Sequence, residues 1–231
     1  MKGVDSVELH AGHHTVVQWL GMSFNMDTLI NTWITMAVVI IVMILATRKR
    51  SQVPSGVQNV VEAILETLQG QLEPNLGKHW TTVSSLLFTF FLFIFVGNEI
   101  GLLPTNHAIS SPTADLNTAL GLSVITTISV WVIGIRVKGI GFFKHFVQPN
   151  PAFLPVNLFE EVGKTVTLAF RLFGNILAGE ILLEVLYFLL PSYVPLAWIW
   201  IGFSLFVGLI QAFIFTVLTT AYIGMGVNEE H

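Results

Sequence analysis

The sequence predicts an all-α integral membrane protein, and both the amount and the placement of its charged residues support this. Hydrophobic residues make up 53% of the 231 residues and charged residues only 10%, whereas a soluble domain usually carries roughly 25% charged residues. No Asp, Glu, Lys or Arg occurs between Leu116 and Ile135 or between Val185 and Asn228. About 20 apolar helical residues cross the hydrocarbon core of a bilayer, so both stretches are long enough to span it.

The apolar runs divide the chain into a polar lead-in, residues 1–25, and a single membrane domain, residues 26–231. We expect the lead-in to be flexible and to lie outside the hydrocarbon. Three runs have the length of one crossing and predict spans at about 26–46, 82–103 and 116–137. The first run ends in a basic cluster with no small-residue cleavage pattern, which predicts a retained anchor and not a cleaved signal peptide.

Three further segments are helical in pattern but differ from a simple span. Residues 55–72 carry apolar side chains at helical spacing with Glu62 and Glu66 on the other side, which predicts an amphipathic helix. The last two segments, about 156–190 and 195–225, are longer than a perpendicular crossing needs. We therefore expect both of them to be steeply tilted or to lie partly along the membrane.

Basic residues indicate the orientation of the chain. They cluster on the connections after the first and third predicted spans, at Arg48, Lys49, Arg50 and Lys78 and at Arg136, Lys138 and Lys144. Cytoplasmic loops of membrane proteins are enriched in Lys and Arg. The N-terminus is therefore expected outside and the C-terminus in the cytoplasm.

Several classes of site are not expected in this chain. The net charge of −4 and the absence of a basic patch argue against nucleic-acid binding, and the chain has no cysteine for a disulfide or a thiolate metal site. His10, His13 and His14 are interpreted as part of a flexible polar tail and not as metal ligands. No complete phosphate-binding loop occurs. We expect no metal, no cofactor and no catalytic residue, so the chain is not predicted to be an enzyme on its own.

Residues 157–184 concentrate polar and ionisable side chains in an otherwise apolar helix. An ionisable group at mid-membrane costs about 2.5–3.5 kcal/mol on insertion scales, so such groups are rare unless they are paired, wetted or functional. At about 100° per residue, Glu160, Lys164, Asn175 and Ala178 are among the residues that lie within about 40° of Arg171. Glu180 and Glu184 point the other way, at about 180° and about 140° from Arg171.

The two faces of this helix predict two tasks. A guanidinium stays protonated in proteins, so Arg171 can attract the carboxylate of a partner but cannot pass a proton onward. Glu180 and Glu184 can exchange protons where water reaches them. The alternative is that Arg171 pairs with an acid inside its own bundle, and that Lys164 only extends its ammonium towards the membrane interface.

The last segment carries a second polar stripe. Ser204, Gln211 and Tyr222 fall within about 20° of one line along a helix. Such a stripe can contact water or can simply hydrogen-bond to the preceding helix. Gly97 and Gly101 form a GxxxG pattern, which is a weak indication of close helix–helix contact.

Two motifs resemble a known family. Residues 168–180, Leu-Ala-Phe-Arg-Leu-Phe-Gly-Asn-Ile-Leu-Ala-Gly-Glu, resemble the arginine helix of subunit a of F-type ATP synthases, and residues 209–219, followed by Tyr222, resemble its final helix. The loop Ser111–Asp115 and the basic end of the first span, Thr47–Arg50, also fit the family. The resemblance covers nearly the whole chain.

This resemblance implies an ion-translocating stator in the plasma (inner) membrane of a bacterium. In the family, two long, steeply tilted helices pack against a rotor ring of c subunits. The subunit supplies two half-channels that pass H⁺ or Na⁺ to and from carboxylates of that ring. The implied partners are the c-subunit ring, the b subunits of the peripheral stalk and the rest of the ATP synthase.

The resemblance also assigns roles to individual residues. Arg171 matches the arginine that separates the two half-channels. Residues that match the external half-channel or its mouth are Asn175, Glu180, Gln211 and Asp115, and either Glu160 or Glu161 corresponds to an acid near the cytoplasmic exit. Some members have a histidine where this chain has Ser204, and Glu184 is an additional acid. One hypothesis is therefore that water and the Glu180/Glu184 pair replace that histidine, in which case Glu184→Gln slows ion flux.

Two alternatives belong to other classes of function. The first is a stand-alone anion or solute transporter in which Arg171 binds an anionic substrate, but such transporters often show repeated halves and this sequence shows none. The second is a structural membrane subunit whose polar residues serve only packing. Co-purification with a ring of small hairpin proteins would favour the stator over both.

Overall fold

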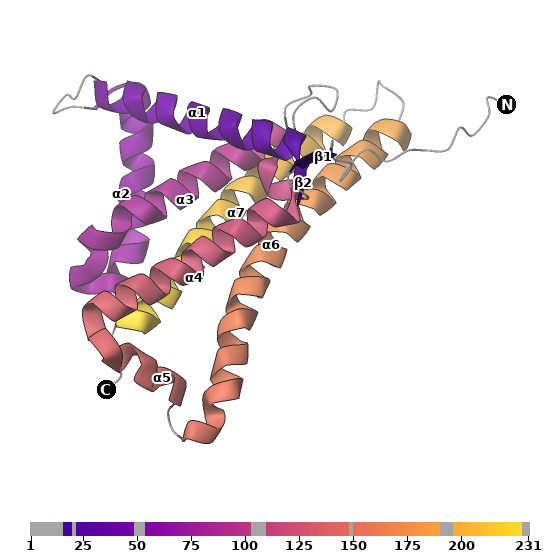
Figure 1. The fold of residues 1–231 in the computed structure, drawn as a ribbon. Helices are drawn as coiled ribbons and strands as arrows, with labels where there is room; N and C mark the ends of the chain where they lie inside the picture. The colour runs from indigo at the N-terminus through magenta and orange to yellow at the C-terminus, as the bar shows by residue number, and fades with distance from the viewer. Residues whose placement is uncertain are drawn as a thin grey trace.

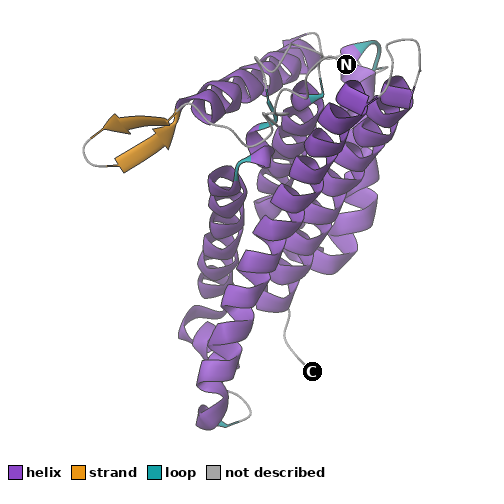
Figure 2. Ribbon diagram, turned by 90° about the vertical axis from the view of Figure 1, so that its right-hand side faces the viewer, coloured by secondary structure: helices purple, strands orange, loops and turns teal. Residues whose placement is uncertain are grey.

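The structure is a computed structural model, and it describes residues 16–19, 22–48, 54–102, 110–147, 150–189 and 196–227. Nearly all of these residues are helical (Figures 1 and 2). The long helices are α1 (Met26–Arg48), α2 (Val57–Leu76), α3 (Trp80–Gly101), α4 (Leu116–Lys138), α6 (Leu154–Leu189) and α7 (Leu196–Val227). Shorter elements connect them: η1 (Gly77–His79), η2 (Pro112–Ala114), η3 (Gly139–Phe143), α5 (Lys144–Val147) and η4 (Pro151–Phe153).

The helices confirm the predicted all-α membrane fold class. Within the described residues, five helical segments are long and apolar enough to cross a membrane. A helix suits this environment because it satisfies its backbone hydrogen bonds internally. The predicted amphipathic segment continues through Pro74 to the end of α2, where Gly77, with a φ of 51°, turns the chain into α3. The position of each segment relative to the bilayer stays a prediction.

A short hairpin precedes the first helix, and the sequence did not predict it. β1 (Val16–Trp19) pairs with β2 (Met22–Asn25) in an antiparallel register that sets Val16 opposite Asn25. The hairpin projects away from the helices (Figure 2). Its residues belong to the segment expected to be a flexible lead-in; residues 1–15, which include His10, His13 and His14, lie outside the described residues.

The hydrophobic core contains buried residues of α2, α3, α4, α6 and α7. Val83, Leu87, Phe90 and Ile94 are buried along one face of α3 at spacings of three or four residues, the pattern of a helix with one inward side. Phe90 packs edge-to-face on Phe215 of α7, with ring centroids 5.8 Å apart. This core holds α3 firmly against α7, which positions the polar end of α3.

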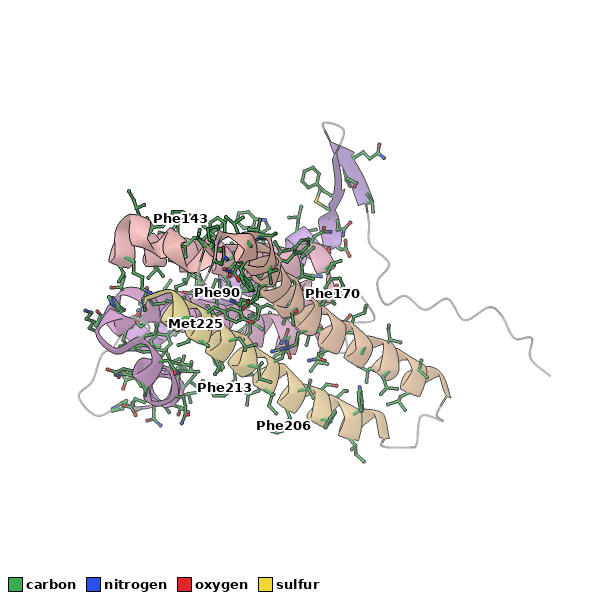
Figure 3. All side chains as sticks on the ribbon, turned by 90° about the horizontal axis from the view of Figure 1, so that it is seen from below. Phe90, Phe143, Phe170, Phe206, Phe213 and Met225 are labelled. Carbon is green, nitrogen blue, oxygen red and sulfur yellow. The ribbon has the colours of Figure 1, made fainter. Side chains whose placement is uncertain are left out.

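The two last helices are the longest elements. α6 has 36 residues and α7 has 32, so their lengths are roughly 54 Å and 48 Å at 1.5 Å per residue. They run side by side and extend past the other helices (Figures 1 and 3). Because a bilayer core is only about 30 Å thick, helices of this length support the predicted steep tilt.

Candidate functional site

One side of α6 is left uncovered by the described residues. Exposed residues recur along it every three or four positions: Phe159, Val162, Val166, Phe170, Gly174, Ala178 and Leu182. We call these residues the open face of α6. No atom lies within 4 Å of the position that a Cβ on Gly174 would take. The open face therefore has room for a partner, and Phe170 marks it in Figure 3.

Arg171 lies at the edge of the open face. Its neighbours along the helix surface, Asn175 and Ala178, are exposed, while Leu168 and Leu172 on the other side are fully buried. Arg171 is half-buried, and within the described residues its guanidinium makes no hydrogen bond and no ion pair. The alternative expectation, a pair with an acid of its own bundle, is therefore not seen in that part of the chain. A half-buried charge without a partner among the described residues must be met by water or by a group outside those residues.

One turn beyond Arg171, a hydrogen bond joins the two long helices. Asn175 Nδ2 donates to Gln211 Oε1 at 2.8 Å, and Gln211 is buried with a relative exposure of 2%. Trp200 Nε1 adds a second link by donating to the carbonyl of Gly179 at 3.2 Å. The amide pair fixes the register of α6 against α7 beside the arginine, as the interhelical interpretation of Gln211 predicted.

A cavity of about 210 Å³ lies between α3, α6 and α7. Its polar lining comes from Asn98, Asn175, Glu180, Trp200 and Ser204. We call it the Glu180 cavity. Because a single water needs only about 10–15 Å³ of such space and two or more polar partners, this cavity can hold several waters. Ser204 Oγ is buried and has no hydrogen-bond partner within the described chain, so it is available to such a water.

Glu180 faces the turn before α4 and not the open face, in agreement with its predicted position opposite Arg171. Its Oε1 accepts from the backbone N–H of Ser111 at 3.1 Å. Ser111 and Thr113 are joined hydroxyl to hydroxyl at 2.6 Å, and Thr113 Oγ1 donates to Asn98 Oδ1 at 2.6 Å. A polar chain thus runs from Glu180 across the end of α3. The side chain of Glu184 lies outside what the structure describes, so the hypothesis of a Glu180/Glu184 pair stays a prediction.

The two glycines of the GxxxG pattern let this turn approach α3 closely. A Cβ on Gly101 would lie 2.5 Å from Ser111 N, and a Cβ on Gly97 would lie 3.2 Å from Pro112 Cγ. The expected helix–helix contact is present at Gly97, whose Cβ would also lie 3.5 Å from Cγ2 of Thr35 on α1, whereas at Gly101 the neighbour is the turn. The two glycines leave space for the Ser111–Ala114 backbone, which holds the hydrogen bond to Glu180 in place.

Asp115 caps α4 and links it to the start of α1. It is 4% exposed, and its carboxylate accepts from the backbone N–H and side chain of Asn117, capping the helix. The other oxygen accepts from Asn25 Nδ2 at 2.7 Å and Thr28 Oγ1 at 2.8 Å. This carboxylate ties the first helix to the fourth. Its sequence-derived role as an acid near a channel mouth stays a prediction.

A second polar group lies near the other end of α6. Lys164 Nζ is 3.0 Å from Glu160 Oε1 and 3.6 Å from Glu161 Oε2. It also lies over the ring of Tyr222, 6.0 Å from the centroid. Glu161 accepts from Trp131 Nε1 of α4 at 3.3 Å, whereas the Glu160 side chain is 63% exposed. A small cavity of about 30 Å³, the Lys164 cavity, is lined in part by Glu161, Lys164 and Tyr222.

The structure thus divides the predicted site residues into separate groups. The polar stripe of α7 faces α6 along its length: Ser204 lines the Glu180 cavity, Gln211 bonds to Asn175, and Tyr222 lines the Lys164 cavity. The Glu180 cavity and the Lys164 cavity share no lining residue. Among the described residues, no group of three or more His, Asp or Glu is placed to hold a metal ion.

Sequence analysis missed two residues at the end of α3. Asn98 is 2% exposed and donates from Nδ2 to the carbonyl of Gly208 at 3.2 Å, which joins α3 to α7. Glu99 is next to it, and both of its carboxylate oxygens are buried without a hydrogen-bond partner in the described residues. The available signal was an acid within the last turn of a predicted span, which is a rare placement for a charge.

Fold and site together define a multi-pass helical membrane protein that brings polar groups between its longest helices, next to an uncovered apolar surface. Comparison with known proteins agrees with this class. Residues 29–224 match the family described as ATP synthase A chain, and the chain belongs to that family.

Individual relatives are similar over almost their full length. The chain is 39% identical over 227 residues to the ATP synthase subunit a of Streptococcus agalactiae serotype III, covering 93% of this chain and 95% of the relative. It is 40% identical over 221 residues to the ATP synthase subunit a of Desulforamulus reducens, covering 91% and 83%. The match therefore includes both long helices and the site between them.

Proposed function

We propose that this chain is the ion-translocating stator subunit of a rotary F-type ATP synthase. In this proposal the Glu180 cavity and the Lys164 cavity belong to two half-channels, and a ring of c subunits packs on the open face of α6. Carboxylates of that ring carry H⁺ (or Na⁺) from one half-channel to the other. The observation that supports this most strongly is Arg171, a half-buried cation at the edge of an open apolar face with no counter-ion in the described chain.

The spacing along α6 supports two offset paths. At 1.5 Å per residue, Glu180 lies about 13 Å from Arg171 in one direction and Glu161 about 15 Å in the other. The two cavities have no lining residue in common, so an ion that enters one has no polar route to the other along the described cavities. A moving carboxylate on a partner supplies the missing step, because it can be loaded at one cavity and unloaded at the other.

Arg171 gives this step its electrostatic control. A guanidinium stays charged in a protein, so it stabilises an ionised carboxylate that passes beside it and disfavours the neutral, ion-loaded form. The loaded carboxylate must therefore travel the other way, through the lipid, to reach the second half-channel. Each charge that crosses the membrane contributes about 2.3 kcal/mol per 100 mV, which is the free energy that the complex can couple to ATP synthesis.

The positions of the basic residues support the orientation in this proposal, and membership of the family supports its partners. The Lys164 cavity is placed on the cytoplasmic side, where Glu160 or Glu161 serves the exit, and the Glu180 cavity on the outer side of a bacterial plasma membrane. The N-terminus is then outside and the C-terminus in the cytoplasm. The peripheral-stalk b subunits and the nucleotide-binding sector are the remaining partners, and this chain conducts ions without catalysing a reaction itself.

The stand-alone anion transporter is the less favoured alternative. In that alternative Arg171 faces a substrate cavity inside the chain. Arg171 lines neither the Glu180 cavity nor the Lys164 cavity, and its surface neighbours on α6 are exposed. A cation turned towards an apolar outer surface suits a protein partner in the membrane better than a dissolved anion.

The decisive experiment replaces Arg171 in the assembled complex. Inverted membrane vesicles with Arg171→Ala should hydrolyse ATP but lose ATP-driven ion pumping, measured by the quenching of a gradient-sensitive dye. Arg136→Ala is the matched control, because Arg136 is exposed at the end of α4 and lies outside both cavities. Co-purification of the c ring with each variant verifies assembly. Normal pumping by Arg171→Ala would refute the proposal.

A further inference from the structure

Glu99 is a buried acid that the proposed mechanism does not yet use. It lies in the last turn of α3, and each of its carboxylate oxygens is buried with no hydrogen-bond partner among the described residues. It forms no ion pair there either. Leaving a carboxylate without partners in an apolar setting is costly, so the position calls for a bound cation, a proton or water.

Glu99 lies beside the Glu180 cavity, next to the lining residue Asn98, although Glu99 does not itself line the cavity. A Cβ built on Gly208 of α7 would lie 3.0 Å from Glu99 Oε1 and 3.2 Å from the Cβ of Asn98. Asn98 is itself a lining residue of the cavity, as is Ser204, which lies one helical turn before Gly208. The carboxylate of Glu99 therefore approaches the same turn of α7 that lines the cavity.

Two further features suit an ion-accepting role. α7 contains no Asp, Glu, Lys, Arg or His from Leu196 to Val227, so no charge on that helix competes for Glu99. Ser204 Oγ, on the cavity side of the same turn, is also buried without a partner within the described chain. Ser204 thus supplies an unsatisfied oxygen to a cavity that can hold several waters, and the two unsatisfied oxygens of Glu99 lie beside the same turn of α7.

We propose that Glu99 is a second ion-accepting carboxylate of the half-channel that contains Glu180. When the ion is a proton, the Glu99 carboxylate accepts it from a hydronium in the cavity, which becomes water. The protonated Glu99 then gives it to the next water, and the hydronium formed there protonates the Glu180 carboxylate, so that Glu99 ends ionised and each water ends neutral. When the ion is Na⁺, the same oxygens act as ligands during its passage. Glu99, on α3, is proposed in addition to Glu184, whose predicted role with Glu180 stays a prediction. This inference rests on the proposed function, because it needs ions to pass through the Glu180 cavity.

The hydrogen-bond chain at the end of α3 fixes Glu99 relative to Glu180. Asn98 is held on one side by the carbonyl of Gly208 and on the other by Thr113, and Thr113 bonds to Ser111, whose N–H holds Glu180. The backbone next to Glu99 is therefore anchored to the same turn that anchors Glu180. Two acids held in this way can exchange an ion through water without any movement of the helices.

The test measures passive ion conduction through the membrane sector in vesicles from which the ATP-hydrolysing part has been removed. The parent complex is assayed first with a H⁺ gradient in Na⁺-free buffer and then with a Na⁺ gradient, and the variants are assayed with the ion that the parent conducts. Glu99→Gln keeps the shape and removes the charge. It should slow conduction roughly tenfold, less than the ~10²–10⁴-fold typical of a positioned acid–base group, because cavity water offers a bypass. Glu66→Gln, an exposed glutamate of α2, is the matched control and should conduct normally.

Two additional variants separate an ion-accepting role from a structural one. Glu99→Asp keeps a carboxylate and should conduct at close to the parent rate. Gly208→Ala places a methyl group against the Glu99 carboxylate. Alone, it should slow conduction. Combined with Glu99→Gln, it should slow conduction little further, because the carboxylate is already absent. Unchanged conduction in Glu99→Gln, or equal slowing by Glu99→Gln and Glu99→Asp, would overturn the inference.

The failure of this inference is distinguishable from failure of the proposed function. If Arg171→Ala abolishes ATP-driven pumping while Glu99→Gln leaves conduction intact, the stator role stands and only the role of Glu99 is lost. If Arg171→Ala pumps normally, the proposed function fails, and the role of Glu99 fails with it.

Discussion

Replacing Gly101 by alanine should disturb the turn that holds Glu180. The added Cβ would lie 2.5 Å from Ser111 N, 2.6 Å from its Cβ and 2.8 Å from its Cα. Comfortable contacts between such atoms are about 3.5–4.0 Å, so the Ser111 backbone must move away by about 1 Å. The hydrogen bond from Ser111 N to Glu180 Oε1, now 3.1 Å, then exceeds the range in which such bonds form.

The size of the effect follows from these contacts. Overpacking of this kind costs about 1–3 kcal/mol, and the loss of a hydrogen bond to a charged group costs about 1.5–3 kcal/mol. The gain from replacing glycine in a helix is about 0.5–1 kcal/mol, and it is smaller here because Gly101 is the last residue of α3. We expect Gly101→Ala to lower the free energy of unfolding by roughly 2–4 kcal/mol.

The measurement is the unfolding of the full-length chain in mild detergent micelles, titrated with a denaturing detergent and followed by tryptophan fluorescence. Gly121→Ala is the matched control, because Gly121 lies in the helical part of α4 and no atom would be within 4 Å of its new Cβ. Gly97→Ala, whose Cβ would lie 3.2 Å from Pro112 Cγ and 3.5 Å from Thr35 Cγ2, both side-chain atoms, should fall between the two. Equal stability of Gly101→Ala and Gly121→Ala would show that the turn is not held by this contact.

Two other contacts give predictions of their own. Asp115→Asn replaces one acceptor oxygen by an amide donor, which then faces the donors of Asn25 or Thr28. We expect the free energy of unfolding to fall by about 2–3 kcal/mol in the same titration. Little change would mean that the hydrogen bonds of Asp115 are not needed for stability. Asn175→Ala and Gln211→Ala, combined in a double-mutant cycle, should show a coupling energy of about 0.6 kcal/mol and at most about 1.7 kcal/mol, as for other hydrogen bonds between membrane helices. A coupling of zero would contradict the bond between them.

Helical periodicity predicted the arrangement around Arg171 well, because angles within one helix do not depend on its neighbours. The sequence placed Glu180 on the side opposite Arg171 and Asn175 on the same side. The structure agrees, since Glu180 contacts Ser111 whereas Asn175 is exposed beside the open face. The stripe of α7 was predicted for the same reason.

Contacts between distant segments were not predictable in this way. The pattern of Gly97 and Gly101 indicates only that something approaches α3 closely, and an extended turn fits such a groove as well as a helix does. Glu99 was missed because the sequence does not show whether an acid in the last turn of a span reaches the membrane interface or is buried by another helix. Only the packing of α7 against α3 shows that its carboxylate is covered.

The sequence by itself determined the membrane-spanning class, the approximate helix positions and the faces on which Arg171 and Glu180 lie, because hydrophobicity and helical geometry are local properties. The tertiary structure alone decided which groups share a cavity. It separated the Glu180 cavity from the Lys164 cavity, and it brought Glu99 of α3 next to Gly208 of α7. The physical reason is that burial and pairing depend on how helices far apart in the chain pack together, and no local pattern records that packing.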